Sequence, residues 1–298
     1  MDGSTERPGL GRVVVGVDGS PSARTALAWA AGEAVLRGSG LSVVHATDTD
    51  ALYLSDAETG RVRRAAEELL DSAVGTVAAR HPELTVVREL ATGTPARALR
   101  DAAALNGTIV VGHRGLGGFS ALLLGSVGLE LAADATTPVV VVRDAAETAE
   151  AGAVLAGVRD ADDLGCARAA AREALLRKVP LRLLHVWGTT PSTGVRAMLP
   201  GSSAEAARAH VHALAEVTER LSDEFPDLDL DADGQKDHSV PGALVEASHH
   251  ADLLVAGGRR APGYLGPTLG RTTLGLLQHA HCPVQLIPRH GAGHGHTS

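Results

Sequence analysis

The chain of 298 residues contains one long stretch twice, and this duplication limits its fold more than any other feature. The stretch "RVVVGVDGSPSARTALAWAAGEAVLRGSGLSVVHATD", from 12 to 48, corresponds to "AVLAGVRDADDLGCARAAAREALLRKVPLRLLHVWG", from 153 to 188. Identical residues stand at matching places in the two halves: Gly16 and Gly157, Glu33 and Glu173, Arg37 and Arg177, His45 and His185, Gly112 and Gly257, Pro138 and Pro283. Copies of about 140 residues are too long for a solenoid repeat. The duplication therefore predicts two complete domains, 1–144 and 153–290, with a linker at 145–152 and a tail at 291–298.

Short apolar runs alternate with helical patterns along the first copy. The expected strands are 12–18, 40–47, 84–91, 107–112 and 138–143, and the expected helices are 21–37, 56–80, 95–105 and 126–136. The run at 12–18 is continuously apolar, which is typical of a strand buried on both faces. This alternation predicts the α/β class, with a five-stranded, mostly parallel, doubly wound sheet flanked by helices in each tandem domain.

Composition excludes several classes of function. A net charge of −8 argues against binding to nucleic acid and gives no attraction to acidic membranes. Cys166 and Cys282 have no CxxC spacing, so we expect a reducing, cytoplasmic location. The N-terminal stretch has no apolar core of a signal peptide, and no run is long and apolar enough to span a membrane.

A glycine-rich loop lies between the strand 107–112 and the helix 126–136. Its pattern is Gly112-x2-Gly115-x9-Gly125-Ser126. Loop glycines permit positive φ angles and close approach of the backbone to a ligand. Ser126 is expected to N-cap the helix, whose free N–H groups and dipole would favour phosphate at the carboxyl end of the sheet. A flexible turn before a capped helix is the alternative, and a Walker loop is excluded because Gly-Lys-Ser/Thr does not occur.

With these residues the chain resembles the universal stress protein family, as a tandem two-domain member. The similarity extends over nearly the whole chain, and in the first copy it is carried by "VVVGVDGSPSARTALAWA", "LSVVHA", "GTPARALRDAA" and "GSVGLELAADATTPVVVVR". ATP-binding members of the family carry G-x2-G-x9-G-(S/T), which the first copy matches at every defined position. The resemblance implies two tandem Rossmann-like domains and ATP as the cofactor, with or without Mg²⁺.

The resemblance also assigns roles to single residues. It implies that Asp18 contacts the nucleoside and that the main chain of Ala46 flanks the adenine. It implies that Gly112 and Gly115 let the loop wrap the phosphates. The donors of hydrogen bonds to the phosphates would be Gly125, Ser126 and Val127. The alternative for Asp18 is a turn residue, since "DGS" is itself a turn signal. We interpret His45 as a structural residue at a strand end. His113 and Arg114 could meet phosphate oxygens or could be solvated.

The second copy departs from the glycine pattern. Arg260 stands at the place of Gly115 and Arg271 at the place of Ser126, whereas Gly270 keeps the third glycine. Arg159 aligns with Asp18, although a shift of one residue would bring Asp160 there. Two interpretations remain open. The site is either degenerate and empty, or it is an altered anion site in which Arg259, Arg260 and Arg271 supply side-chain donors.

No metal site is expected from the 14 histidines. His210 and His212 are two apart on a helix, and His249 and His250 are adjacent, so neither pair shares a face. His290, His294 and His296 lie in the Gly/His tail. The sequence also specifies no catalytic triad and no acid–base pair, so we expect a protein that is not an enzyme, with at most slow, incidental ATP hydrolysis.

The leading functional hypothesis is an ATP-binding protein of stress response or signalling, with the nucleotide in the first domain. The alternative is an interaction or dimerisation module that has lost nucleotide binding. A related ATP pyrophosphatase would need an SGGxDS-like loop after its first strand, and "VDGSPSA" is not such a loop. The partner expected is an adenine nucleotide. The last strands, "PVVVVR" and "PVQLIPR", are expected to pair within the chain as a pseudo-dimer, while a homodimer and the identity of a protein partner stay open.

Overall fold

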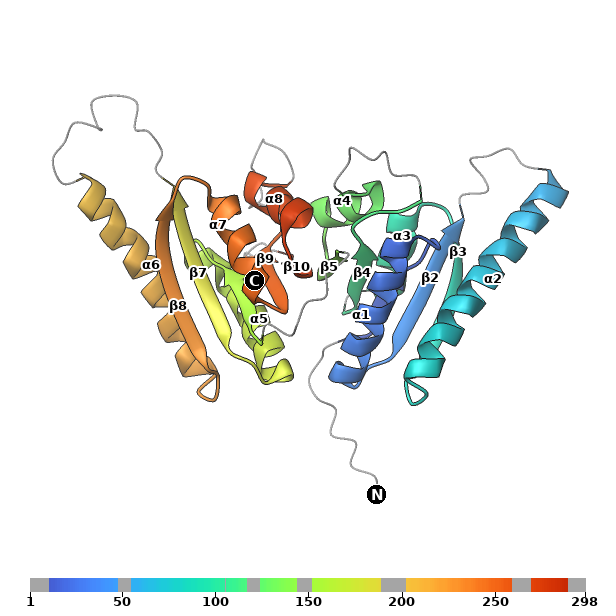
Figure 1. The fold of residues 1–298 in the computed structure, drawn as a ribbon, viewed down its shortest axis with the longest axis horizontal. Helices are drawn as coiled ribbons and strands as arrows, with labels where there is room; N and C mark the ends of the chain where they lie inside the picture. The colour runs from blue at the N-terminus through green and yellow to red at the C-terminus, as the bar shows by residue number, and fades with distance from the viewer. Residues whose placement is uncertain are drawn as a thin grey trace, which may run out of the picture. The chain divides into compact units, whose positions relative to one another are not determined.

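The chain divides into two compact units, Met1–Asp144 and Ala145–Ser298 (Figure 1). A computed structural model describes residues 11–47, 55–104, 106–116, 124–143, 152–188, 202–258 and 269–288. The predicted tail and all of the predicted linker except its last residue lie outside these described residues.

The first unit is the predicted alternation of strands and helices. Its elements are β1 (Val13–Gly16), α1 (Pro21–Arg37), β2 (Leu41–Thr47), α2 (Asp56–Arg80), β3 (Val86–Thr92), α3 (Pro95–Ala103), β4 (Thr108–Gly112), α4 (Ser126–Ala133) and β5 (Val139–Val142). The strands pair in the order β3-β2-β1-β4-β5, and every pair is parallel. The predicted five-stranded parallel sheet is therefore confirmed, with strand and helix ends within three residues of their predicted places.

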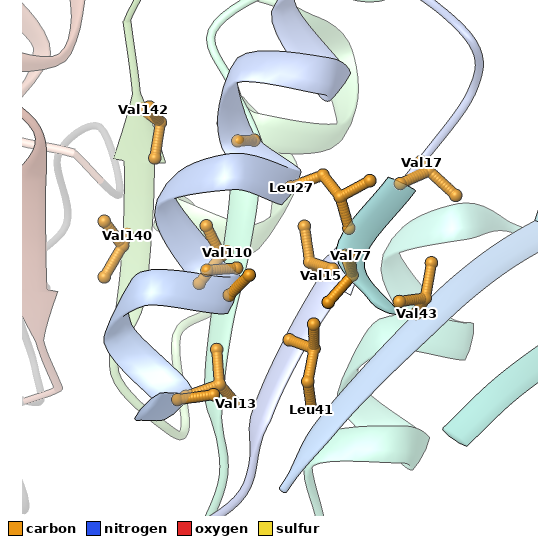
Figure 2. Close-up of a cluster of buried hydrophobic side chains, with 14 of the residues drawn as sticks. Val13, Val15, Val17, Leu27, Leu41, Val43, Val77, Val110, Val140 and Val142 are labelled. Atoms are coloured by element: carbon orange, nitrogen blue, oxygen red, sulfur yellow. The ribbon is translucent and has the colours of Figure 1, made fainter. Parts of the chain in front are cut away.

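Helices cover both faces of this sheet. Helices α1 and α2 contact each other and pack on β1 and β2, while α3 and α4 form a second contacting pair. Figure 2 shows one resulting core layer, in which valines and leucines of the strands meet Leu27 of α1 and Val77 of α2. Val13, Val14 and Val15 are fully buried, which confirms that β1 is covered on both faces.

The first helix has a clear start and a clear end. Ser20 is the N-cap of α1 and accepts a hydrogen bond from the N–H of Ala23, while Pro21 takes the first turn. Gly38 ends the helix with a φ of 63°, a left-handed conformation that favours glycine. These local signals place the start of α1 directly after β1, beside the carboxyl edge of the sheet.

The second unit repeats the arrangement. Its elements are β6 (Val154–Gly157), η2 (Ala161–Asp163), α5 (Leu164–Arg177), β7 (Leu181–Gly188), α6 (Ser202–Glu224), β8 (Leu230–Asp237), α7 (Val240–Ala247), η4 (Ser248–His250), β9 (Leu253–Gly257), α8 (Arg271–His279) and β10 (Val284–Ile287). The strands pair in parallel in the order β8-β7-β6-β9-β10. The fold predicted for one copy thus occurs twice.

A buried ion pair recurs in both units. Arg37 of α1 bonds to Glu33 at 2.7 Å and to the hydroxyl of Thr108 at 2.8 Å, with side chains that are 1% and 3% exposed for the arginine and glutamate. In the second unit Arg177 pairs with Glu173. The matching Glu and Arg residues of the repeat are therefore core residues, and not part of a surface charge pattern.

Candidate functional site

A cleft of about 430 Å³ opens at the carboxyl ends of β1, β2 and β4, between the start of α1 and the start of α4. This is the edge at which open α/β sheets bind ligands, and the volume is ordinary for a ligand site. All seven residues selected from the sequence line this one cleft: Asp18, Ala46, Gly112, Gly115, Gly125, Ser126 and Val127. The structure therefore brings together residues that are up to 109 positions apart in the sequence (18 to 127).

Gly112 is required by close packing. A Cβ atom at this position would lie 2.6 Å from the Oγ atom of Ser22 and 2.7 Å from its carbonyl carbon. Neither Gly112 nor Gly115 has a positive φ angle, so conformational freedom at these two positions is not the reason for glycine. At Gly112 the reason for glycine is instead that β4 approaches the first turn of α1 too closely for any side chain.

Asp18 holds the beginning of the glycine loop. Its carboxylate accepts hydrogen bonds from the N–H of Ser20 at 2.9 Å and from the N–H of Leu116 at 3.1 Å. The bond to Ser20 makes Asp18 a turn residue, as the alternative interpretation held. The bond to Leu116 adds a long-range contact, so the carboxylate joins the end of β1 to the loop after β4.

The start of α4 differs from the expectation. Gly125 is the N-cap, with φ −70° and ψ 156°, and Ser126 is the first helical residue, without a capping hydrogen bond from its side chain. The prediction that Ser126 caps the helix is therefore wrong, because the extended residue before the helix is the glycine. Since glycine has no side chain to accept a bond, the first N–H groups of α4 remain available at the cleft.

His113 is a structural residue. It is 6% exposed, and its Nδ1 atom lies 2.9 Å from the Oγ atom of Ser22, which also accepts a hydrogen bond from the N–H of Arg114. Arg114, by contrast, lines the cleft. Of the two loop residues left open by the sequence, only Arg114 is thus in position to meet a ligand.

His45 and His185 are held in the same way at the ends of β2 and β7. Each places its Nδ1 atom against a carbonyl oxygen of the neighbouring strand end, Val17 at 2.7 Å and Val158 at 2.9 Å. A carbonyl can only accept, so Nδ1 carries the proton in both rings. These contacts agree with a structural role for His45.

The corresponding cleft of the second unit is smaller, about 140 Å³. Arg159, at the place of Asp18, bonds to Asp163 through Nε at 3.0 Å and Nη2 at 3.2 Å. Burial raises the pKa of the Asp163 carboxyl, and the charge of Arg159 partly opposes this. An arginine–aspartate pair thus stands where the first unit has a carboxylate bonded to the loop.

The start of α8 matches the start of α4. Gly270 is the N-cap, with φ −69° and ψ 155°, and Arg271 is the first helical residue. Neither helix start has a side-chain cap, so the replacement of Ser126 by Arg271 in the second copy removes no capping hydroxyl. Arg259 and Arg260 lie outside the described residues.

A cluster of rings in the second unit was not predicted. The Nε2 atom of His185 lies 2.9 Å from the Nδ1 atom of His210 on α6, and the His210 ring stacks on Trp187 with centroids 5.0 Å apart. The available signal was the exchange of a small residue for a histidine, because the repeat aligns His210 with Ala66. His212 is exposed, in agreement with its different helix face.

The described residues form neither a metal cluster nor a membrane-spanning helix. They contain no group of three or more His, Cys, Asp or Glu side chains that could hold a metal ion. Within the same part of the chain, no helix is long and apolar enough to cross a bilayer. Cys166 and Cys282 are buried free thiols, and burial raises the pKa of Cys282 to about 12.

The sequence and the fold of this chain are similar to those of known proteins. The profile of the Universal stress protein family matches the chain twice, over residues 9–143 and 152–288. A universal stress protein of Mycobacterium tuberculosis is 30% identical over 287 residues, covering 91% of this chain and 94% of the relative. One of Mycolicibacterium smegmatis is 29% identical over 291 residues, covering 92% and 96%. The crystal structure of a universal stress protein from Archaeoglobus fulgidus superposes with a TM-score of 0.70 at 18% identity, covering 94% of this chain and 98% of that chain, and shows the fold.

Proposed function

Because the chain belongs to the universal stress protein family, we propose that its first unit binds ATP in the cleft at the ends of β1, β2 and β4. One observation carries the proposal. The cleft joins the uncapped start of α4 to the complete glycine pattern and to Asp18. An uncapped helix start attracts anions, and the absence of side chains at Gly112 and Gly115 lets Ser22 and Asp18 pack directly against the loop backbone.

ATP supplies a triphosphate anion and a planar base, and the lining residues offer groups for both. The N–H groups of Ser126 and Val127 and the Ser126 hydroxyl would bind phosphate oxygens, with Arg114 as the cation of the cleft. Asp18 would accept from ribose hydroxyls, and the main chain of Ala46 would meet the adenine edge. Mg²⁺ would be held by the phosphates.

The proposed role is binding without rapid turnover, in stress response or signalling. Among the described residues that line the cleft, Asp18 is the one carboxylate. Both of its oxygens already accept backbone hydrogen bonds, from the N–H groups of Ser20 and Leu116, so the carboxylate is engaged in holding the loop. Bound nucleotide would then act through the conformation of the loop and not through its hydrolysis.

The second unit does not take the nucleotide in this proposal. Its cleft has about a third of the volume of the first (140 against 430 Å³), and the pair of Arg159 and Asp163 lines it. One ATP per chain is therefore expected. The cytoplasmic location and the pairing of the two last strands stay predictions from the sequence.

The test is titration calorimetry of ATP into the whole chain. Two variants block the first cleft: Ser126→Arg imitates the second copy, and Gly125→Asp places a carboxylate at the N-cap of α4. Asp is a favourable N-cap, and a Cβ atom at Gly125 meets nothing closer than 3.6 Å, so the helix is kept. Gly270→Asp is the matched control in the second unit.

The expected result is a stoichiometry near one, lost in both first-cleft variants and kept in Gly270→Asp. No binding at millimolar ATP would favour the interaction module instead. A stoichiometry near two would overturn the exclusion of the second unit.

A further inference from the structure

A cavity of about 380 Å³ lies between α1 and α2 of the first unit. It differs from the cleft proposed for ATP, because most of its lining comes from these two helices and not from strand ends and the glycine loop. Leu27 and Val77, which belong to the core layer in Figure 2, are 4% and 3% exposed and line the cavity. The floor of the cavity is therefore apolar and reaches the core.

Small side chains explain why the two helices leave this space. Ala28 and Ala31 line the cavity from α1, and Ala73 lines it from α2. Packed helices have axes about 8–10 Å apart, and an alanine methyl group is too short to fill the space between them. The cavity therefore follows from the sequence of the two helices.

The ionisable side chains of the cavity are all basic. They are Arg24, Arg80 and His81, and no acidic residue of the described part of the chain lines the cavity. Arg24 donates a hydrogen bond to the carbonyl of Gly19 at 2.8 Å. Arg80, in contrast, is exposed and has no ion pair with a described residue. A ligand that neutralises Arg80 must therefore bring its own negative charge.

The second unit has an ion pair at the corresponding place. The repeat aligns Ala28 with Arg168, and it aligns "RHPELTV" from 80 with "EFPDLDL" from 224, so Glu224 corresponds to Arg80. The Nε atom of Arg168 lies 2.6 Å from Oε2 of Glu224, and its Nη2 atom bonds to Oε1. This bidentate pair joins α5 to α6. The first unit has an arginine in place of the carboxylate, and only a methyl group in place of the arginine.

We infer that the cavity between α1 and α2 binds a free fatty acid. The alkyl chain packs on Leu27, Leu69 and Val77, and the carboxylate binds the guanidinium of Arg80, whose fork of donors matches its two oxygens. The ligand gives the first unit the contact of arginine with carboxylate that the second unit makes within its own chain. The volume is that of a small-molecule site, whereas a partner helix needs an open groove on the surface.

The experiment is calorimetric titration of decanoate into the whole chain, below the concentration at which decanoate forms micelles. We expect saturable binding of one decanoate. Arg80→Gln should weaken it about tenfold or more, as for loss of a hydrogen bond between charged groups. Arg64→Gln is the matched control, because it removes the same charge from an exposed position of α2 outside the cavity. The double variant Ala28→Arg, Arg80→Glu rebuilds the ion pair of the second unit and should abolish binding.

Two further ligands separate the chain from the headgroup. Octanoate is shorter by two methylene groups and should bind about tenfold more weakly. Decanol has no charge, so it should bind equally to the wild type and to Arg80→Gln. Decanoate should also raise the Tm of the wild type and leave that of the double variant unchanged, while both proteins fold without it.

Four results would overturn the inference. They are full decanoate affinity in the double variant, an equal loss in Arg64→Gln, binding to phosphatidylglycerol vesicles without binding of free decanoate, and a dimer that Ala28→Arg disrupts without decanoate binding. The last two would assign the cavity to a membrane surface or to a second copy of the chain. None of these outcomes depends on ATP binding by the first unit.

Discussion

The carboxylate of Asp18 stands directly against Gly115: a Cβ atom at position 115 would lie 2.6 Å from Oδ2 of Asp18. The two residues are therefore one structural feature, in which the absence of a side chain at 115 lets the carboxylate reach the N–H of Leu116. The second copy has changed both partners, to Arg159 and Arg260. A side chain at position 115 would therefore require the Asp18 carboxylate to move from its place against the loop.

A first prediction follows for Gly115→Ala. The added methyl should displace Asp18 and lower the free energy of unfolding by about 1–3 kcal/mol, as overpacking does. Asp18→Ala in the same chain should recover most of this loss without recovering ATP binding. Urea unfolding of the two single variants and the double variant measures the coupling. Additive effects would show that the two residues do not act as a pair.

Gly112→Ala tests the contact of β4 with α1. Its Cβ would meet the backbone of Ser22, which cannot rotate away, so we expect a loss of about 1–3 kcal/mol in the free energy of unfolding. Gly32→Ala in α1 is the matched substitution, because nothing lies within 4 Å of its Cβ. There the helix should gain about 0.5–1 kcal/mol. Equal effects at the two sites would contradict this explanation of Gly112.

The free energy of unfolding should depend on whether one or both charges of the buried pair of Glu33 and Arg37 are removed. Arg37→Met leaves Glu33 charged in the core, and we expect a loss of about 3–5 kcal/mol in the free energy of unfolding. The double variant Glu33→Leu, Arg37→Met removes both charges and should be closer to the wild type. Thermal unfolding of the three proteins measures this. A double variant less stable than Arg37→Met would contradict the prediction.

The ring cluster of the second unit predicts a dependence on pH. Burial, and then the neighbouring His185, lower the pKa of His210. The unfolded chain therefore binds the proton more readily, and stability should fall as the pH drops from about 7.5 to about 5.5. His210→Ala, which restores the residue found in the first copy, should make the curve flatter. In a Trp29→Phe background, the fluorescence of Trp187 should follow the charge on the stacked His210 ring. Identical pH curves for wild type and His210→Ala would refute this.

The fold was predictable because its signals are local and occur twice. Continuous apolar strands, Pro21 and Pro95 in first turns, and Gly38 after α1 each specify one element, and the repeat confirms the assignment. The ends of elements were less certain, because apolar residues such as Val17 continue past the last strand hydrogen bond.

The sequence could predict which residues form the candidate site, but not the structural role of each residue. Resemblance placed seven residues in one cleft, yet the purpose of Gly112 depends on Ser22, which is 90 positions away (112 to 22). The prediction that Ser126 is the N-cap was wrong by one position, because the helix begins at Ser126 and Gly125 is the N-cap. The contact of His185 with His210 needs the packing of α6 on β7, which no spacing reveals.

The glycine N-caps of α4 and α8 have one more consequence, for motion. A helix whose first turn lacks a side-chain cap opens more easily, and an anion that completes the turn holds it closed. The amide protons of Leu129 and Leu274 report on these two turns, since each bonds to the glycine carbonyl of its own cap. Their hydrogen exchange should slow when the adjacent cleft fills. The exchange rate of one backbone amide in each unit would therefore report whether the cleft of that unit is occupied.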